Sequence, residues 1–156
     1  MKIQVIPPDP DHKSAPIYTY ERAVAYLADK DLQEDDQVWL VMDTDDWSDA
    51  QLMEVERACS DKGWHLAISN PCFEVWLYLH YDDLPTDFSG DCKAMKSLLH
   101  QVVQGGYSPE TAIPNLAAAI TRAENLLADT PDRLPGPLQT QLHLLAKAIQ
   151  PFLQED

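Results

Sequence analysis

Three aspartates, Asp43, Asp45 and Asp46, directly follow four apolar residues in the segment WLVMDTDD. Side chains alternate between the two faces of an extended chain, so Asp43 and Asp45 point to the same side and their carboxylates repel each other. Mg²⁺ relieves such repulsion, since it prefers hard oxygen ligands and needs only one or two carboxylates; Mn²⁺ is the alternative ion. The spacing predicts a metal site at Asp43, Asp45 and Asp46. The competing interpretation is that these acids only stabilise the start of the next helix, for which one acid would suffice.

A second group of residues capable of chemistry lies in the segment SNPCFEVWLYLH. Ser69 or Asn70 could cap a helix whose first residue is Pro71. Glu74 falls in the first turn, where it either complements the helix dipole or bonds back to the cap, or belongs to a site. His80 lies near the end of the helix, as a dipole partner, a packed side chain or a site residue.

The three cysteines, Cys59, Cys72 and Cys92, are odd in number and show no CxxC spacing. Two of them lie in segments with apolar periodicity, which favours reduced thiols in the core over a disulfide framework or a zinc site.

The elements that position these residues follow from apolar periodicity. Strand, helix, strand, helix, strand with short connections is typical of an α/β fold, in which parallel strands place ligand sites at their carboxyl ends. Thr19 is the expected cap of the first helix, and a later helix is expected to start near Ile113 because Pro114 follows. The expected strands are residues 3–6, 36–43 and 64–69, the expected helices are residues 19–31 and 47–63, and the chain is expected to be helical from residue 71 onward.

Composition restricts the class of protein. The chain has 156 residues, of which 45% are hydrophobic, enough for one core, so we expect a single domain. The net charge of −15 opposes non-specific attraction to nucleic acid or to an anionic membrane. We find no signal segment and no apolar run long enough to span a membrane, so we expect a cytoplasmic protein without a membrane partner.

Two motifs resemble those of a known family. SNPCFEVWLYLHY resembles the Ser-Asn-Pro-x-Phe-Glu-x-Trp-x-x-x-His hallmark of RloB-like proteins, and VWLVMDTDD resembles their Asp-x-Asp motif after a hydrophobic strand. The resemblance implies a Toprim-like three-layer α/β domain with a mostly parallel sheet, and a role in bacterial anti-phage defence by abortive infection. It also implies a core over residues 1–81 and a helical extension over residues 82–156.

By this resemblance Asp43 and Asp45 would carry the metal ion of a nuclease, and Asn70, Glu74 and His80 would complete or support the site. Such nucleases begin with a strand that ends in a glutamate acting as general acid and base, which would lie upstream of IQVI. The family's Tyr-x-Lys element has its nearest counterpart in GGYSPE, which lacks the lysine. We therefore expect an incomplete catalytic set, each missing role costing a factor of about 10²–10⁴ in rate.

Two functions follow. The first is a Mg²⁺-dependent nuclease with nucleic acid as its substrate. The second is a non-catalytic, acidic interaction or regulatory subunit that docks an AAA-type ATPase, often encoded beside members of this family, or another defence protein. A haloacid-dehalogenase-type phosphatase ranks lower, because Trp47 stands where those sites have Thr or Val.

Overall fold

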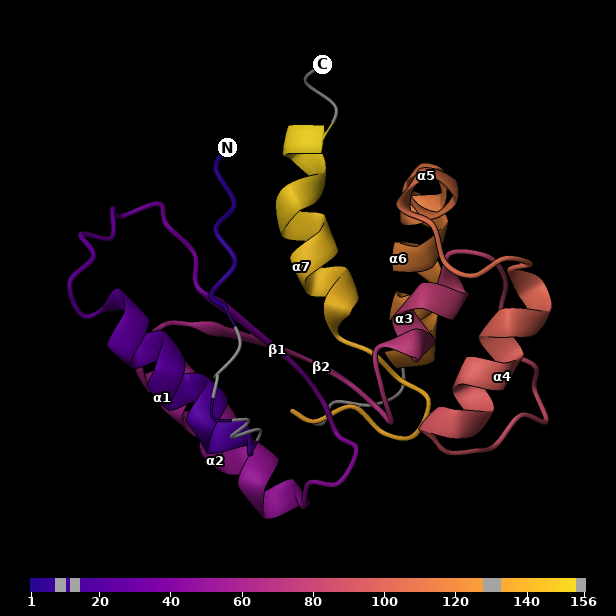
Figure 1. Ribbon diagram of the computed structural model, residues 1–156, viewed down its shortest axis with the longest axis horizontal. Helices are drawn as coiled ribbons and strands as arrows, with labels where there is room; N and C mark the ends of the chain where they lie inside the picture. Colours follow the sequence, from indigo (N-terminus) through magenta and orange to yellow (C-terminus); the bar gives the residue numbers. More distant parts are fainter. Residues whose placement is uncertain (8–10, 12–14, 128–132, 154–156) are drawn as a thin grey trace. The chain divides into compact units, whose positions relative to one another are not determined.

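The computed structural model describes residues 1–7, 11, 15–127 and 133–153 (Figure 1). The chain divides into two compact units. The first comprises Met1–Leu40 and Asp46–Leu66, and the second comprises Val41–Asp45 and Ala67–Asp156. The division into a core over residues 1–81 and an extension over residues 82–156 stays a prediction.

A small parallel sheet is formed by β1 (Trp39–Asp43) and β2 (His65–Ser69). The His65 N–H donates to the Val38 carbonyl at 2.9 Å, and the Thr44 N–H donates to the Ser69 carbonyl at 3.0 Å, a progression that fits parallel strands. Two of the three expected strands are therefore confirmed, and the protein is a mixed α/β protein with a parallel strand pair.

The expected strand at residues 3–6 is wrong. The structure assigns no strand to this segment, and Ile3 and Val5 are 62% and 82% exposed. Apolar β-branched residues favour a strand only where a neighbouring strand and a buried face stabilise it.

In the first unit, α1 (Pro16–Leu27) packs against α2 (Asp49–Asp61) (Figure 1). Helix α2 lies within the expected range 47–63, and Ser48, one of the two capping residues that the sequence offers there, is its cap: the Ser48 side chain accepts from the Gln51 N–H, while the Gln51 side chain accepts from the Ser48 N–H. Thr19 is not a cap, because α1 already begins at Pro16, a residue suited to the first helical turn.

After β2 the described part of the second unit is mainly helical, as predicted, but residues 135–141 were also expected to be helical, and the helix there starts only at Leu142. Helix α3 packs against α4 and α6, and α6 packs against α7 (Figure 1). A 3₁₀ turn begins at the predicted Ile113 and leads into α6. The elements are α3 (Glu74–Leu79), α4 (Cys92–Val102), α5 (Pro109–Ala112), η1 (Ile113–Asn115), α6 (Leu116–Leu127), α7 (Leu142–Ile149) and η2 (Gln150–Leu153).

The end of β2 is buttressed by a distant segment. Ser69 forms an antiparallel bridge with Thr140, and their buried hydroxyl oxygens lie 2.7 Å apart. The Asn70–Pro71 peptide bond that follows is cis. Helix α3 begins at Glu74 rather than Pro71, so the predicted helix start is wrong. In the part of the chain that the structure describes, no helix has the length and apolar character needed to cross a membrane.

Candidate functional site

Asp43 and Asp45 lie where the strand pair ends. β1 ends at Asp43, and the chain continues beside the residues that follow β2: the Asp45 N–H donates to the Pro71 carbonyl at 3.1 Å. The Asp43 carboxylate, half-buried, accepts a hydrogen bond from the Phe73 backbone N–H, whereas the Asp45 side chain is exposed. The fold therefore brings both acids to the entry of α3, the place expected from the carboxyl ends of parallel strands.

The electrostatic environment of Asp43 disfavours its charged form. Burial, together with the negative charges of Glu74 and Asp45, raises the pKa of Asp43 from 3.8 to about 6. The hydrogen bond from Phe73 and the positive charge of Lys96 act in the opposite direction. A carboxyl group placed in this way is a candidate for binding a cation or moving a proton.

Glu74 connects this strand end to α4. It occupies the first turn of α3, and its Oε1 lies 3.8 Å from Nζ of Lys96. The Glu74 side chain is 21% exposed and that of Lys96 is 58% exposed, so the lysine can reorient toward a ligand. The capping interpretation of Glu74 is not supported, since no side chain caps α3 by a hydrogen bond. Sequence periodicity did not assign Lys96 to the site, because 22 residues separate it from Glu74.

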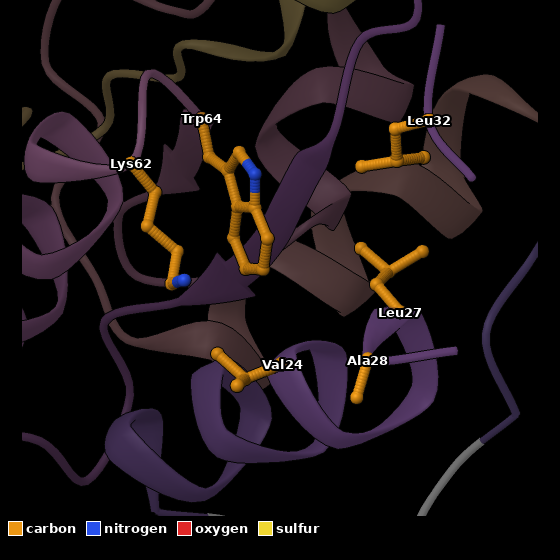
Figure 2. A pocket seen from close by; sticks show the side chains of 6 residues that line it. All are labelled: Val24, Leu27, Ala28, Leu32, Lys62 and Trp64. Carbon is orange, nitrogen blue, oxygen red and sulfur yellow. The ribbon is translucent and has the colours of Figure 1, made fainter. Parts of the chain in front are cut away.

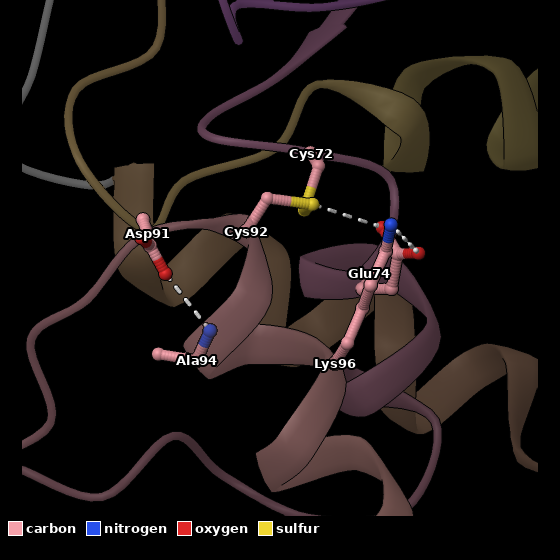
Figure 3. Close-up of a disulfide and its surroundings, with 6 residues drawn as sticks. All are labelled: Cys72, Glu74, Asp91, Cys92, Ala94 and Lys96. Carbon is pink, nitrogen blue, oxygen red and sulfur yellow. Dashed lines mark hydrogen bonds and ion pairs between the residues drawn. A yellow bond between two sulfur atoms is a disulfide. The ribbon is translucent and has the colours of Figure 1, made fainter.

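The cysteine prediction is half right. Cys59 is a buried free thiol, as expected, but Cys72 and Cys92 form a disulfide, with their Cα atoms 5.7 Å apart (Figure 3). The correction arises from tertiary packing, because α3 against α4 brings together two cysteines separated by 20 positions. Cys92 Sγ lies 3.7 Å from Oε2 of Glu74. A disulfide sulfur carries no proton, so this is a van der Waals contact rather than a hydrogen bond.

The ligand atoms of Cys72, Glu74 and Cys92 lie within 4.8 Å of one another, and among the described residues this is the one such set of three His, Cys, Asp or Glu side chains. The three residues of the predicted metal set fall in different units. Asp46 belongs to the first unit and has a φ of +66°, whereas Asp43 and Asp45 belong to the second. Their role as metal ligands stays a prediction.

Asn70 and His80 each have a structural partner. Asn70 Nδ2 donates to the Pro135 carbonyl at 3.0 Å. His80 is buried at the end of α3, where its Nδ1 lies 2.9 Å from the Trp76 carbonyl and its ring packs edge-on against Trp76. Burial lowers the pKa of His80, which favours the neutral imidazole. These contacts fit the packed-side-chain interpretation, and a part in catalysis stays a prediction for both residues.

A hollow of about 300 Å³ lies in the first unit (Figure 2). Its lining is mostly apolar, and Nζ of Lys62 lies 5.4 Å from the centroid of the Trp64 ring. The lining residues are Val24, Leu27, Ala28, Leu32, Lys62 and Trp64, and none of them is a predicted site residue. Lys62 is the one titratable side chain in this lining, and no carboxylate there could hold the predicted metal ion.

Comparison with known proteins supports the resemblance of the two motifs to those of a protein family. The family model described as RloB-like protein matches residues 2–149. This range includes both the Asp-x-Asp segment and the Asn-Pro-Cys-Phe-Glu segment. Neither the curated proteins nor the solved structures give a match.

Proposed function

The chain belongs to the RloB-like family, and from this premise we propose that it is a Toprim-like nuclease of bacterial anti-phage defence that depends on Mg²⁺ or Mn²⁺. One observation carries the proposal: Asp43, at the end of a parallel strand pair, interacts electrostatically with both Asp45 and Glu74, the latter at the start of the next helix. Ligands of α/β proteins commonly bind at this edge of the sheet. The three-layer Toprim arrangement and the defence role are parts of the same proposal.

The donor set suits a hard divalent cation. Asp43 and Asp45 offer carboxylate oxygens. Burial and then the charges of neighbouring acids raise the pKa of Asp43, and bound positive charge would offset both effects. When bound, Mg²⁺ lowers the pKa of a water molecule and stabilises charge on the phosphate oxygens.

The chain's own residues supply positioning and charge. The Phe73 N–H orients the Asp43 carboxylate, and Glu74 adds a further acceptor beside it. The exposed ammonium group of Lys96, which pairs with Glu74, is placed to neutralise a phosphate. In this proposal Lys96 takes over part of the task of the lysine that GGYSPE lacks.

A second candidate function rests on charge. The net charge of −15 is repulsive to a polyanion. In the helical second unit, Arg122 is engaged within the protein, since its guanidinium donates to the Leu79 carbonyl at 2.7 Å and lies 3.5 Å from Asp83. These features favour an acidic, non-catalytic subunit that docks an AAA-type ATPase or another defence protein through complementary charge.

Cleavage assays separate the two functions. The full chain is incubated with Mg²⁺ or Mn²⁺ and with fluorescent single- and double-stranded DNA and RNA. We expect Asp43→Asn to lower the cleavage rate by a factor of about 10²–10³, as for loss of a group that stabilises charge in the transition state. Asp87→Asn, which removes an equal charge from an exposed turn, is the matched control and is expected to cleave like the wild type. Equal rates for wild type and Asp43→Asn would remove the assignment of Asp43.

If the wild type cleaves none of these substrates with either ion, the nuclease proposal fails and the interaction subunit becomes the better account. It is tested by gel filtration of the chain with an AAA-type ATPase of the kind often encoded beside members of this family. A complex that dissociates as salt rises is expected, because charge complementarity weakens with ionic strength. Separate elution at low salt would contradict this second function.

A further inference from the structure

We propose that Cys72, Cys92 and Glu74 form a zinc site in the reduced protein, and that the Cys72–Cys92 disulfide is the closed, metal-free form of this site. The disulfide by itself would be an ordinary crosslink. The additional feature is the Glu74 carboxylate, which lies beside the two sulfur atoms. The ligand atoms of all three side chains are within 4.8 Å of one another (Figure 3).

The separations suit tetrahedral Zn²⁺. With Zn–S distances of about 2.3 Å and Zn–O distances of about 2.1 Å, a thiolate sulfur and a carboxylate oxygen on one ion lie about 3.6 Å apart, and two sulfurs lie about 3.8 Å apart. Cys92 Sγ and Glu74 Oε2 are already 3.7 Å apart. Once the S–S bond is broken, only a small rotation of the cysteine side chains separates the sulfurs to the required distance. A water molecule takes the fourth position.

Two of the three ligands lie at helix starts. Glu74 is the first residue of α3, and Cys92 is the first residue of α4, whose preceding residue Asp91 caps the helix by accepting from the Ala94 N–H at 2.9 Å (Figure 3). The N-terminus of this 11-residue helix stabilises negative charge, which favours the thiolate form of Cys92. Cys72 is buried in the connection two residues before α3, and the packing of α3 against α4 holds the other two ligands in place.

The charges nearly balance. Two thiolates and one carboxylate carry three negative charges, Zn²⁺ supplies two positive charges, and Lys96, whose Nζ lies 3.8 Å from Glu74 Oε1, adds a third. Cys72 is buried, with 1% of its surface exposed, but Glu74 and Lys96 both reach solvent and leave a path for the ion.

Opening the site requires two electrons. A dithiol reductant supplies two electrons and two protons: the Cys72–Cys92 bond breaks, two thiols form, and the reductant becomes its cyclic disulfide. Zn²⁺ then replaces the two thiol protons, which pass to solvent. Oxidation reverses the sequence and releases the ion.

The test uses Co²⁺ as a spectroscopic substitute for Zn²⁺ on the full chain. The chain is reduced with a dithiol, which is then removed anaerobically. We expect the reduced wild type to bind one Co²⁺ with a thiolate-to-metal absorption band that Zn²⁺ abolishes, and the oxidised wild type to show no band. Cys92→Ser should weaken binding by more than about 100-fold, because loss of outer-shell partners alone costs 10–100-fold. Glu74→Gln, which keeps the shape, should weaken it by about tenfold or more.

Cys59→Ser is the matched control, since Cys59 is a buried free thiol in the first unit, and it is expected to keep the band. Cys92 is partly exposed at a helix start, where serine is well tolerated, so its variant is expected to fold, and circular dichroism checks this. A reduced wild type without the band, or a band lost in Cys59→Ser and kept in Cys92→Ser, would overturn the proposal. The readout needs no cleavage, so the zinc site and the proposed nuclease stand or fall separately.

Discussion

Asp43→Asn is predicted to stabilise the folded protein at neutral pH, although it removes a residue proposed to bind metal. The wild-type carboxyl is half-buried beside Glu74, which raises its pKa from 3.8 to about 6. Above that pH the folded state must hold a charge that its surroundings disfavour. Asparagine removes the charge, and its Oδ1 still accepts the hydrogen bond from the Phe73 N–H.

The magnitude follows from linkage between proton binding and folding. Each tenfold change in proton affinity is worth about 1.4 kcal/mol, so the rise from 3.8 to about 6 would correspond to about 3 kcal/mol for a group that solvent does not screen. Asp43 is partly exposed, and solvent screens its interactions, which reduces the expected gain to about 1.5 kcal/mol.

The direction of the Asp43 pKa shift determines the pH range in which the carboxyl group affects stability. Because the pKa of Asp43 is higher in the folded protein than the ordinary 3.8, the folded state binds the proton more tightly. The Asp43 contribution to stability is thus fully present below pH 3.8 and is lost as the pH rises through about 6. Wild type and Asp43→Asn should therefore unfold alike near pH 4 and differ most above pH 7.

Urea denaturation at a series of pH values, followed by circular dichroism, measures the difference in free energy of unfolding. Asp87→Asn changes the net charge equally from an exposed position, so subtracting its effect isolates the local term. Mg²⁺ should stabilise the wild type and Asp87→Asn but not Asp43→Asn, since a ligand stabilises only the state that binds it. Equal shifts in the free energy of unfolding for Asp43→Asn and Asp87→Asn at neutral pH would contradict an unfavourable charge on Asp43. So would a loss of stability in Asp43→Asn at that pH.

Three further substitutions probe the structure around the site by the same urea measurement. Ser48→Ala removes the cap that accepts from the Gln51 N–H and should cost about 1 kcal/mol; an unchanged midpoint would contradict the capping box. Thr140→Val leaves the buried Ser69 hydroxyl without its partner at 2.7 Å and should cost about 1–3 kcal/mol, while a neutral effect would show that the pair adds nothing. Met95→Ala opens a cavity at a fully buried position of α4 and should cost about 2–5 kcal/mol, and a loss under 1 kcal/mol would mean that the site collapses around it.

Local patterns predicted much of the secondary structure. The helix after the acidic segment was recognisable from a capping residue, Ser48 or Asp49, at its start and from Gly63 at its end, because such signals need only neighbours within one turn. The two paired strands were recognisable from their apolar runs, and the helical second half was recognisable from its periodicity and proline and glycine breaks. The family, too, was recognisable from two short motifs, and the family model confirms it over residues 2–149.

Sequence periodicity did not predict the structure correctly where a segment depends on a partner far away in the sequence. Ile3 and Val5 have strand propensity, but propensity cannot supply the neighbouring strand that they lack, and they remain exposed. Pro71 was expected to be the first residue of a helix, yet α3 starts only at Glu74. The backbone at this point bonds instead to distant segments: the Pro71 carbonyl accepts from the Asp45 N–H, and the Asn70 N–H donates to the Gln139 carbonyl.

The sequence by itself determined the inventory of chemical groups and the short elements that carry them, because both depend on residues a few positions apart. Only the tertiary structure decided which groups meet. The packing of α3 against α4 joins Cys72 to Cys92 and sets Lys96 beside Glu74, across separations of 20 and 22 positions. These contacts form because whole helix faces are buried against one another. That burial is a property of the folded chain, and the spacing of neighbouring residues does not encode it.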